Sequence, residues 1–109
     1  MRDGDDFRVV VRRGAKAASS TVVVHVVPGT DGGTTSVGFV VSKAVGDAVT
    51  RNRVKRRLRH LMRERLTVAP PGSRIIVRAL PGAADASGTR LAADLDRALH
   101  RAARVPDPA

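Results

Sequence analysis

The residues best suited to bind a partner lie between Arg51 and Arg65, where the chain reads RNRVKRRLRHLMRER. This stretch holds eight of the twenty basic residues and only one acid, Glu64, so it carries +7 of the formal net charge of +10. In the remainder of the chain, positive and negative charges nearly cancel. Positive charge concentrated on one ordered element indicates a polyanion partner, because lysine and arginine side chains bind phosphate groups.

The same stretch has the period of an amphipathic helix, with Val54, Leu58, Leu61 and Met62 forming one apolar stripe. A solvated surface helix usually alternates the sign of its charges, whereas this one has no acid before Glu64. We therefore expect one face to pack on a core and the other to bind phosphate. At about 100° per residue, Arg53 and Arg57 flank the stripe, and the side chains that point away from it are those of Asn52, Lys55, Arg56, Arg59 and Arg63.

No catalytic or metal-binding constellation accompanies this helix. The histidines His25, His60 and His100 are not at metal-ligand spacing from one another, and the chain has no cysteine. Asp94 and Asp96 would point in different directions on a helix, so we expect two solvated acids rather than a two-metal clamp. The chain also lacks a G-x-S-x-G motif and a glycine-rich phosphate loop. We expect no active site and no metal site of its own.

Aromatic residues are nearly absent, with Phe7 and Phe39 the two present. Stacking of many nucleobases is therefore not available, and recognition must depend on phosphate, sugar and backbone shape. His60 lies on the basic helix, where we expect solvation or a phosphate contact. His25 interrupts a run of valines, and it is either a satisfied half-buried side chain or a lone polar or stacking group on a binding surface.

The bulk properties indicate one small domain over residues 1–109. The absence of cysteine fits a reducing cytoplasm. No apolar run reaches the roughly 18–20 residues that span a membrane, and a basic helix without bulky interfacial residues is a poor membrane binder. We expect a cytoplasmic protein with no membrane partner.

The helices and strands that position the basic helix can be predicted from the spacing of apolar residues and from the glycines and prolines that end such elements. We expect an α+β fold, a small single-domain sandwich in the order helix-strand-strand-(strand)-helix-strand-helix, with the basic helix crossing between two strands. The expected elements up to the basic helix are a helix over Asp3–Arg13, a strand over Thr21–Val27, a flexible hairpin loop over 28–36, an antiparallel strand over Val37–Lys43 and an optional strand near Ser42–Val45. The basic helix is expected from an Asp47 cap to about Leu66, followed by a strand over Ser73–Leu80. The last elements are an amphipathic helix marked by Leu91, Leu95, Leu99 and Ala102 and capped by Ser87 or Thr89, and a tail over 105–109.

The segment from Gly38 to Leu66 resembles the signature of the bacterial ribonuclease P protein component. That family's pattern is a strand ending in Ser-Lys, a glycine-containing link, then Ala-Val-x-Arg-Asn-Arg and a run of basic residues with leucine. This sequence supplies each part with Ser42-Lys43, Gly46, Ala48-Val49, Arg51-Asn52-Arg53, and then Lys55, Arg56, Leu58 and Arg59. Weaker resemblance extends from Asp6-Phe7 to the final helix.

The resemblance implies a fold like that of certain ribosomal-protein domains, an RNA-binding core over about 6–104, and a left-handed crossover, which breaks the usual rule. It also implies a subunit of ribonuclease P that binds the catalytic RNA and precursor tRNA and assists removal of the 5′ leader. In that family the RNA performs the chemistry with Mg²⁺, held mainly by the RNA and substrate. The residues expected to contact RNA are Lys43, Arg51, Asn52, Arg53, Lys55, Arg56, Arg59 and Arg63.

The resemblance further places Phe7 in a central cleft that receives the leader, with Val11 and His25 at neighbouring cleft positions. The family often has aromatic residues where this chain has Val11 and His25, so leader stacking is expected to differ here. The family also usually carries a basic arm before the Asp-Phe pair, where this chain has Met1 and nearby acids.

Three other kinds of protein could carry a basic helix on a small domain. A ribosomal-type RNA-binding assembly protein would need the same basic helix on a small scaffold, and only the motif separates the two. A transcription factor is disfavoured because no short helix and tight turn precede the basic helix, so no DNA partner is expected. An independent nuclease would need clustered acids or a histidine pair, which the sequence lacks.

Overall fold

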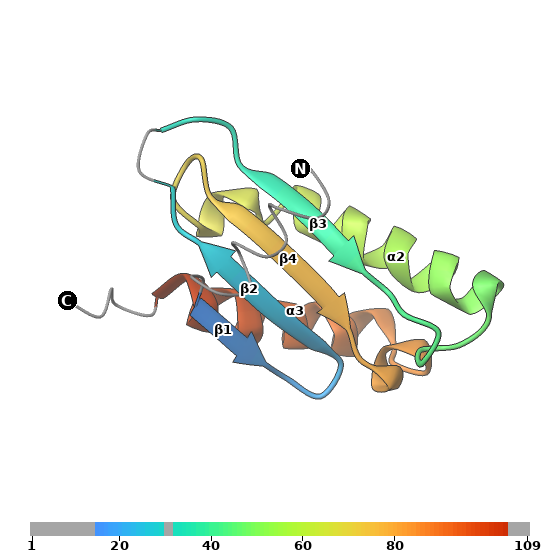
Figure 1. Ribbon diagram of the computed structural model, residues 1–109. Helices are drawn as coiled ribbons and strands as arrows, with labels where there is room; N and C mark the ends of the chain where they lie inside the picture. Colours follow the sequence, from blue (N-terminus) through green and yellow to red (C-terminus); the bar gives the residue numbers. More distant parts are fainter. Residues whose placement is uncertain (1–14, 30–31, 105–109) are drawn as a thin grey trace.

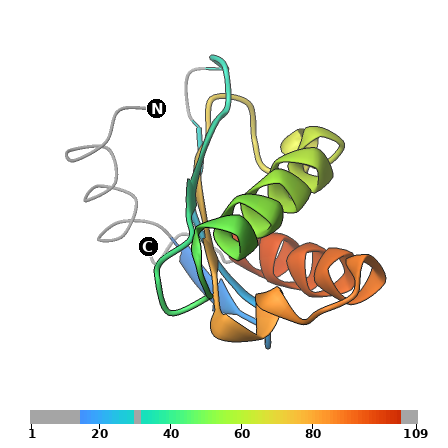
Figure 2. The same cartoon turned by 90° about the vertical axis from the view of Figure 1, so that its right-hand side faces the viewer.

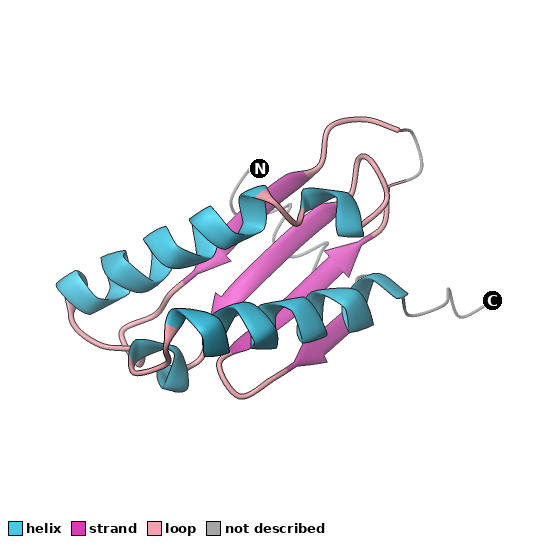
Figure 3. Cartoon of the chain, turned by 180° about the vertical axis from the view of Figure 1, so that it is seen from behind, coloured by secondary structure: helices cyan, strands magenta, loops and turns pink. Residues whose placement is uncertain are grey.

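The computed structural model describes residues 15–29 and 32–104, and in it four strands form one sheet with two helices on a single face. Figure 2 shows the sheet edge-on with both helices on one side of it, and Figure 3 shows the helices in front of the strands. The expected α+β fold is confirmed. The elements are β1 (Ala15–Ala18), β2 (Val22–Val27), β3 (Ser36–Val40), α2 (Ala48–Arg63), η1 (Leu66–Val68), β4 (Arg74–Ala79), η2 (Pro81–Ala84) and α3 (Gly88–Arg104).

The sheet order is β1-β2-β4-β3, so the expected hairpin between β2 and β3 is wrong. β4 lies between them, antiparallel to β2 and parallel to β3 (Figure 1). The connecting segment passes closely over the turn before β4, where the Gly29 N–H donates to Ser73 Oγ at 3.0 Å. A Cβ at Gly29 would lie 2.0 Å from the Pro71 carbonyl oxygen. Glycine is thus required here for close approach of two backbones, and not for a hairpin turn.

Two further differences concern short strands. β1 was not expected, because Ala-Lys-Ala-Ala has little strand propensity, yet it pairs antiparallel with β2 through a tight turn in which the Ser19 N–H donates to the Val22 carbonyl at 2.8 Å. The optional strand near Ser42–Val45 is absent. Those residues form turns instead, with the Val45 N–H donating to the Ser42 carbonyl and the Gly46 N–H to the Lys43 carbonyl, and β3 ends at Val40.

The core lies between the sheet and the two helices. Alternate residues of β2 and β4 point toward the helices, and the valines, isoleucine and alanine at these positions are buried. Val54, Leu58 and Met62 of α2 are buried against them, with Leu61 partly buried beside them, so the apolar stripe expected from the sequence is confirmed. The buried leucines of α3 are Leu91, Leu95 and Leu99.

The connection from β3 through α2 to β4 is left-handed. β3 and β4 are parallel neighbours, and in Figure 1 both arrows point to the lower right while α2 passes behind the sheet. Viewed with the strands pointing up and the helix behind, β4 lies to the right of β3, which is the reverse of the usual arrangement. The handedness implied by the family resemblance is therefore present. Within the described ranges, no helix is both long enough and apolar enough to cross a membrane.

Candidate nucleic-acid interface

The start of α2 is fixed by its cap. Asp47 Oδ1 accepts a hydrogen bond from the Thr50 backbone N–H at 2.8 Å, as the sequence predicted for an N-cap at this residue. That backbone hydrogen bond, followed by one from the Thr50 side chain, lowers the pKa of the Asp47 carboxyl group. The cap sets where the helix begins and the buried stripe sets its rotation, and together they determine which side chains point outward.

The outward face of α2 carries the cations expected there. Arg56, Arg59 and Arg63 are exposed, and Lys55 is partly exposed. Their side chains form no hydrogen bond or ion pair with any residue of the described part of the chain. Four side chains surround a shallow depression of about 210 Å³, called here the outer hollow, and they are those of Asn52, Lys55, Arg56 and Arg59. Unpaired cations around a concave surface can bind phosphate oxygens.

The two arginines that flank the apolar stripe form hydrogen bonds within the protein. The Arg53 guanidinium donates to the Ala84 carbonyl at 3.1 Å and the Arg57 guanidinium to the Ala86 carbonyl at 3.3 Å. These bonds tie α2 to the connection between β4 and α3. Each guanidinium has further donors, so the contact of Arg53 with RNA stays a prediction.

Two predicted contact residues lie near the beginning of α2. Lys43 is exposed in the turn that precedes the helix. Arg51 is partly buried, and its Nε atom is buried without a hydrogen-bond partner among the described residues. A buried donor without an acceptor is costly, so Arg51 is a residue whose environment an acidic ligand would improve.

The last arginine of the basic stretch is used inside the protein. Arg65 Nε lies 2.5 Å from Asp96 Oδ1 of α3, and Arg65 Nη1 donates to the Leu61 carbonyl at 2.7 Å. The hydrogen bond to Asp96 raises the pKa of the Arg65 guanidinium. This pair joins the C-terminal end of α2 to α3.

The expectation of a solvated acid is wrong for Asp94, whereas Asp96 is partly exposed but also paired. Asp94 exposes 1% of its surface, accepts a hydrogen bond from Thr21 Oγ1 at 2.9 Å, and lies 3.1 Å from Arg90 Nε. Asp96 pairs with Arg65. Their partners lie far away in the sequence or on the next helical turn, so spacing alone could not identify them. Both acids connect α3 to other parts of the fold.

The sheet face turned away from the helices, called here the distal sheet face, contains His25. His25 exposes 7% of its surface, and its Nδ1 atom has no hydrogen-bond partner in the described ranges. It is therefore more buried than either sequence alternative assumed, and it is not satisfied at Nδ1. Burial, with Lys16 and then Arg78 adding nearby positive charge, lowers its pKa.

Sequence reasoning missed two basic residues on the distal sheet face. The register places Lys16 opposite His25, and His25 opposite Ile76 of β4. Arg78 follows Ile76 by two residues, so it shares the face with His25, and both Lys16 and Arg78 are exposed. The alternation of side chains along β4 could have placed Arg78 beside His25 only if the pairing of β2 with β4 had been known. The predicted cleft residues Phe7 and Val11 lie outside the described residues, as do the expected Asp3–Arg13 helix and the 105–109 tail.

Comparison with known proteins gives one consistent result. The family model described as Ribonuclease P matches residues 1–103. The ribonuclease P protein component of Streptomyces avermitilis is 54% identical over 109 residues, with 93% of this chain and 89% of that protein covered. The corresponding protein of Nocardioides sp. is 52% identical over 103 residues, with 93% and 88% covered.

Solved structures agree with the sequence relatives. The RNase P protein of Staphylococcus aureus has a TM-score of 0.82 to this chain at 26% identity, with 94% of this chain and 93% of that chain covered. The RNase P protein of Thermotoga maritima, solved in complex with 1-(4-fluorophenyl)-2-thiourea, has a TM-score of 0.80 at 23% identity and shares the fold.

Proposed function

This chain belongs to the ribonuclease P protein family, and from that premise we propose that it binds the catalytic RNA subunit and precursor tRNA and assists endonucleolytic removal of the 5′ leader. The product would be the mature tRNA 5′ end. The place of action implied by this function is the cytoplasm, where precursor tRNA is made.

The outward face of α2 is the observation that carries the proposal. Lys55, Arg59 and Arg63 recur every four residues on one exposed face, and like charges at this spacing destabilise a helix by roughly 0.2–0.5 kcal/mol per pair. No acid of the described part of the chain offsets them. Phosphates of a bound RNA would remove this repulsion and release counterions, so binding would be favoured at low salt.

The division of labour leaves the chemistry to the RNA. The proposal assigns Mg²⁺ mainly to the RNA subunit and the substrate, where it would activate water and stabilise the leaving oxygen. The described residues do not fit as its holder, because they contain no group of three metal-binding side chains and Asp94 and Asp96 are already paired. The residues of this chain would bind and orient RNA.

The leader would lie on the distal sheet face. Lys16 and Arg78 supply exposed positive charge there, on the same face as the buried His25. The predicted contributions of Phe7 and Val11 to this cleft remain part of the proposal. The face lies on the opposite side of the sheet from α2 (Figure 2), so one molecule would have separate surfaces for the RNA subunit and the leader.

The direct test is cleavage of a 5′-labelled precursor tRNA at low Mg²⁺ concentration. We would compare a bacterial ribonuclease P RNA alone, the RNA with this protein, and the protein alone. Cleavage at the mature 5′ end that requires the RNA and is enhanced by the protein is the expected result. Tight RNA binding without enhancement would favour an assembly protein, and cleavage by the protein alone would favour an independent nuclease.

A further inference from the structure

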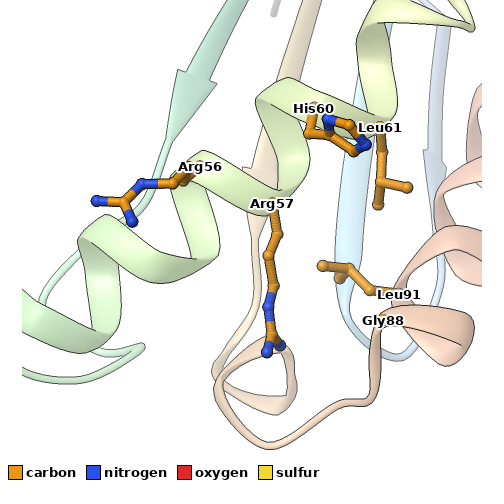
Figure 4. A pocket seen from close by; sticks show the side chains of 6 residues that line it. All are labelled: Arg56, Arg57, His60, Leu61, Gly88 and Leu91. Carbon is orange, nitrogen blue, oxygen red and sulfur yellow. The ribbon is translucent and has the colours of Figure 1, made fainter.

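A second concave surface lies between α2 and the first turn of α3 (Figure 4). This interhelix groove has a volume of about 470 Å³ and is lined by Arg56, Arg57, His60, Leu61, Gly88 and Leu91. A volume of this size falls within the roughly 300–1,000 Å³ of small-molecule sites in proteins. The function proposed above assigns no ligand to this groove.

The groove combines an apolar floor with a basic rim. In Figure 4 the Leu61 side chain extends from α2 toward the start of α3, where Leu91 lies. Leu91 is fully buried, so the partly exposed Leu61 supplies the apolar surface that a ligand can reach. The Arg57 guanidinium is held beside it by the bond to the Ala86 carbonyl, and His60 is exposed on the rim. None of the six lining residues is acidic. This composition suits a ligand that has a flat, weakly polar part and a negative charge.

The end of the groove is open at Gly88, the first residue of α3. A Cβ added to Gly88 would have no atom within 4 Å, so the space beyond it is unfilled. The N-terminal end of a helix carries a partial positive charge, which adds to that of Arg57. This end of the groove therefore favours an anion.

The groove is continuous with the surface that the proposed function assigns to the RNA subunit. Arg56 lines both the outer hollow and the interhelix groove, so a strand following the outward face of α2 reaches the groove at that residue. The distal sheet face lies across the sheet from this position (Figure 2). The leader would thus be kept away from the groove, and the RNA subunit is the RNA that can reach it.

We infer that the interhelix groove receives one unstacked nucleotide of the RNA subunit. Its base would rest on the partly exposed Leu61 beside His60, and its phosphate would lie near Arg57 and the N-terminal end of α3. Unstacked bases splayed from loops and bulges are the usual targets of proteins that contact RNA outside its helices, and an arginine plane can support them. The inference rests on the proposed function and specifies part of its RNA contact.

The test uses two nearly isosteric changes at position 88. Gly88→Glu places a negative charge at the mouth of the groove, whereas Gly88→Gln adds the same bulk without charge. Neither should unfold the protein, since the site is spacious and an acid suits the first turn of a helix. RNA-subunit affinity of the Glu variant should be about tenfold weaker than that of the Gln variant, the size of one lost charged hydrogen bond.

A control separates a local effect from general repulsion. Ala93→Glu adds the same charge to an exposed position of α3 that does not line the groove. It should weaken RNA binding much less than Gly88→Glu. Equal losses from the two Glu variants would show that only net charge matters and would overturn the assignment.

Photocrosslinking identifies the occupant directly. The chain has no cysteine, so Gly88→Cys provides a single attachment point for an azide probe. In the holoenzyme with precursor tRNA, the probe should label one nucleotide of the RNA subunit, and a probe at Ala93→Cys should not label it. Labelling of precursor tRNA, or of no RNA, would overturn the inference.

Failure of the inference can be told apart from failure of the proposed function. If Gly88→Glu binds as well as Gly88→Gln while Arg59→Ala binds more weakly, the groove is empty in the complex and the proposed function stands. If the unaltered protein neither binds the RNA subunit nor enhances cleavage, the proposed function itself is wrong.

Discussion

Arginines of the same helix have two distinct roles, and the difference depends on where each side chain points. Arg56 and Arg59 extend into solvent without acidic partners, while Arg65 pairs with Asp96 and caps the Leu61 carbonyl. The helical period predicted the outward group from the sequence. The role of Arg65 could not be predicted, because Asp96 lies 31 residues further along the chain.

Replacing Arg59 should therefore affect RNA binding and replacing Arg65 should affect stability. Arg59→Ala is expected to weaken binding to the RNA subunit and reduce the slope of log affinity against log salt by about one, if it contacts one phosphate.

Arg65→Ala should lower the free energy of unfolding by about 1 kcal/mol, since Asp96 is partly solvated. Filter binding at several salt concentrations and urea denaturation measure the two effects. An unchanged salt slope for Arg59→Ala would remove it from the interface.

His25 should make stability depend on pH. Its pKa in the folded protein is below the ordinary value of about 6.5, so the unfolded chain takes up the proton first as the pH falls. The free energy of unfolding should be highest above about pH 6.5 and decrease as the pH is lowered below it. Urea titrations followed by circular dichroism, which needs no tryptophan, would measure this between pH 8 and pH 5.

His25→Phe is the matched comparison, because it keeps a planar ring and removes the titrating group. His60 and His100 are unchanged in this variant. The variant should lose less stability than the unaltered protein over this pH range. Identical pH profiles would mean that His25 titrates normally when folded.

Among the elements, those with a strong period were predictable and those defined by pairing were not. The basic helix was placed correctly, with its Asp47 cap and its buried stripe, because both are local patterns. The order of strands was not, since the 28–36 segment looks like a hairpin while β4, some fifty residues from β2, takes the place beside it. Pairing depends on long-range packing, which neighbouring residues do not encode.

The rotation of α2 can be checked at its most buried residue. Leu58 is fully buried in the core, so Leu58→Ala should lower the free energy of unfolding by roughly 2–5 kcal/mol through lost contacts and a residual cavity. Chemical denaturation gives the value. Glu64→Ala, at an exposed position beyond the last turn, serves as the control and should change stability little. A Leu58→Ala protein as stable as the control would contradict the packing of this helix.

At the scale of the whole molecule, the two proposed RNA surfaces lie on opposite sides of one sheet. The concentration of charge on α2 was evident from the sequence, and the family resemblance implied a leader cleft that includes His25, but the basic residues beside His25 could not be predicted. Lys16, His25 and Arg78 come from three different strands, and only the sheet register assembles them. The net charge of +10 is thus divided between two faces of the molecule, both of which we propose to bind RNA.

Substitutions on the two sides should therefore separate two binding events. Arg78→Ala is expected to weaken binding of precursor tRNA that has a leader, and to leave affinity for the RNA subunit and for leaderless tRNA unchanged. Arg59→Ala should instead lower the affinity for the RNA subunit. Binding measured with substrates with and without a leader distinguishes these cases. Equal losses for both tRNAs with Arg78→Ala would mean that the distal sheet face does not contact the leader.

The placement of β4 in the middle of the sheet has a consequence for synthesis on the ribosome. β2 can pair with β1 as soon as it emerges, but its other edge has no partner until Ala79 has been made. At roughly 5–20 residues per second, this edge waits about 3–10 seconds. During that interval a valine-rich strand is open to pairing with other nascent chains. Translation speed across α2 should therefore influence how much of the newly made protein aggregates.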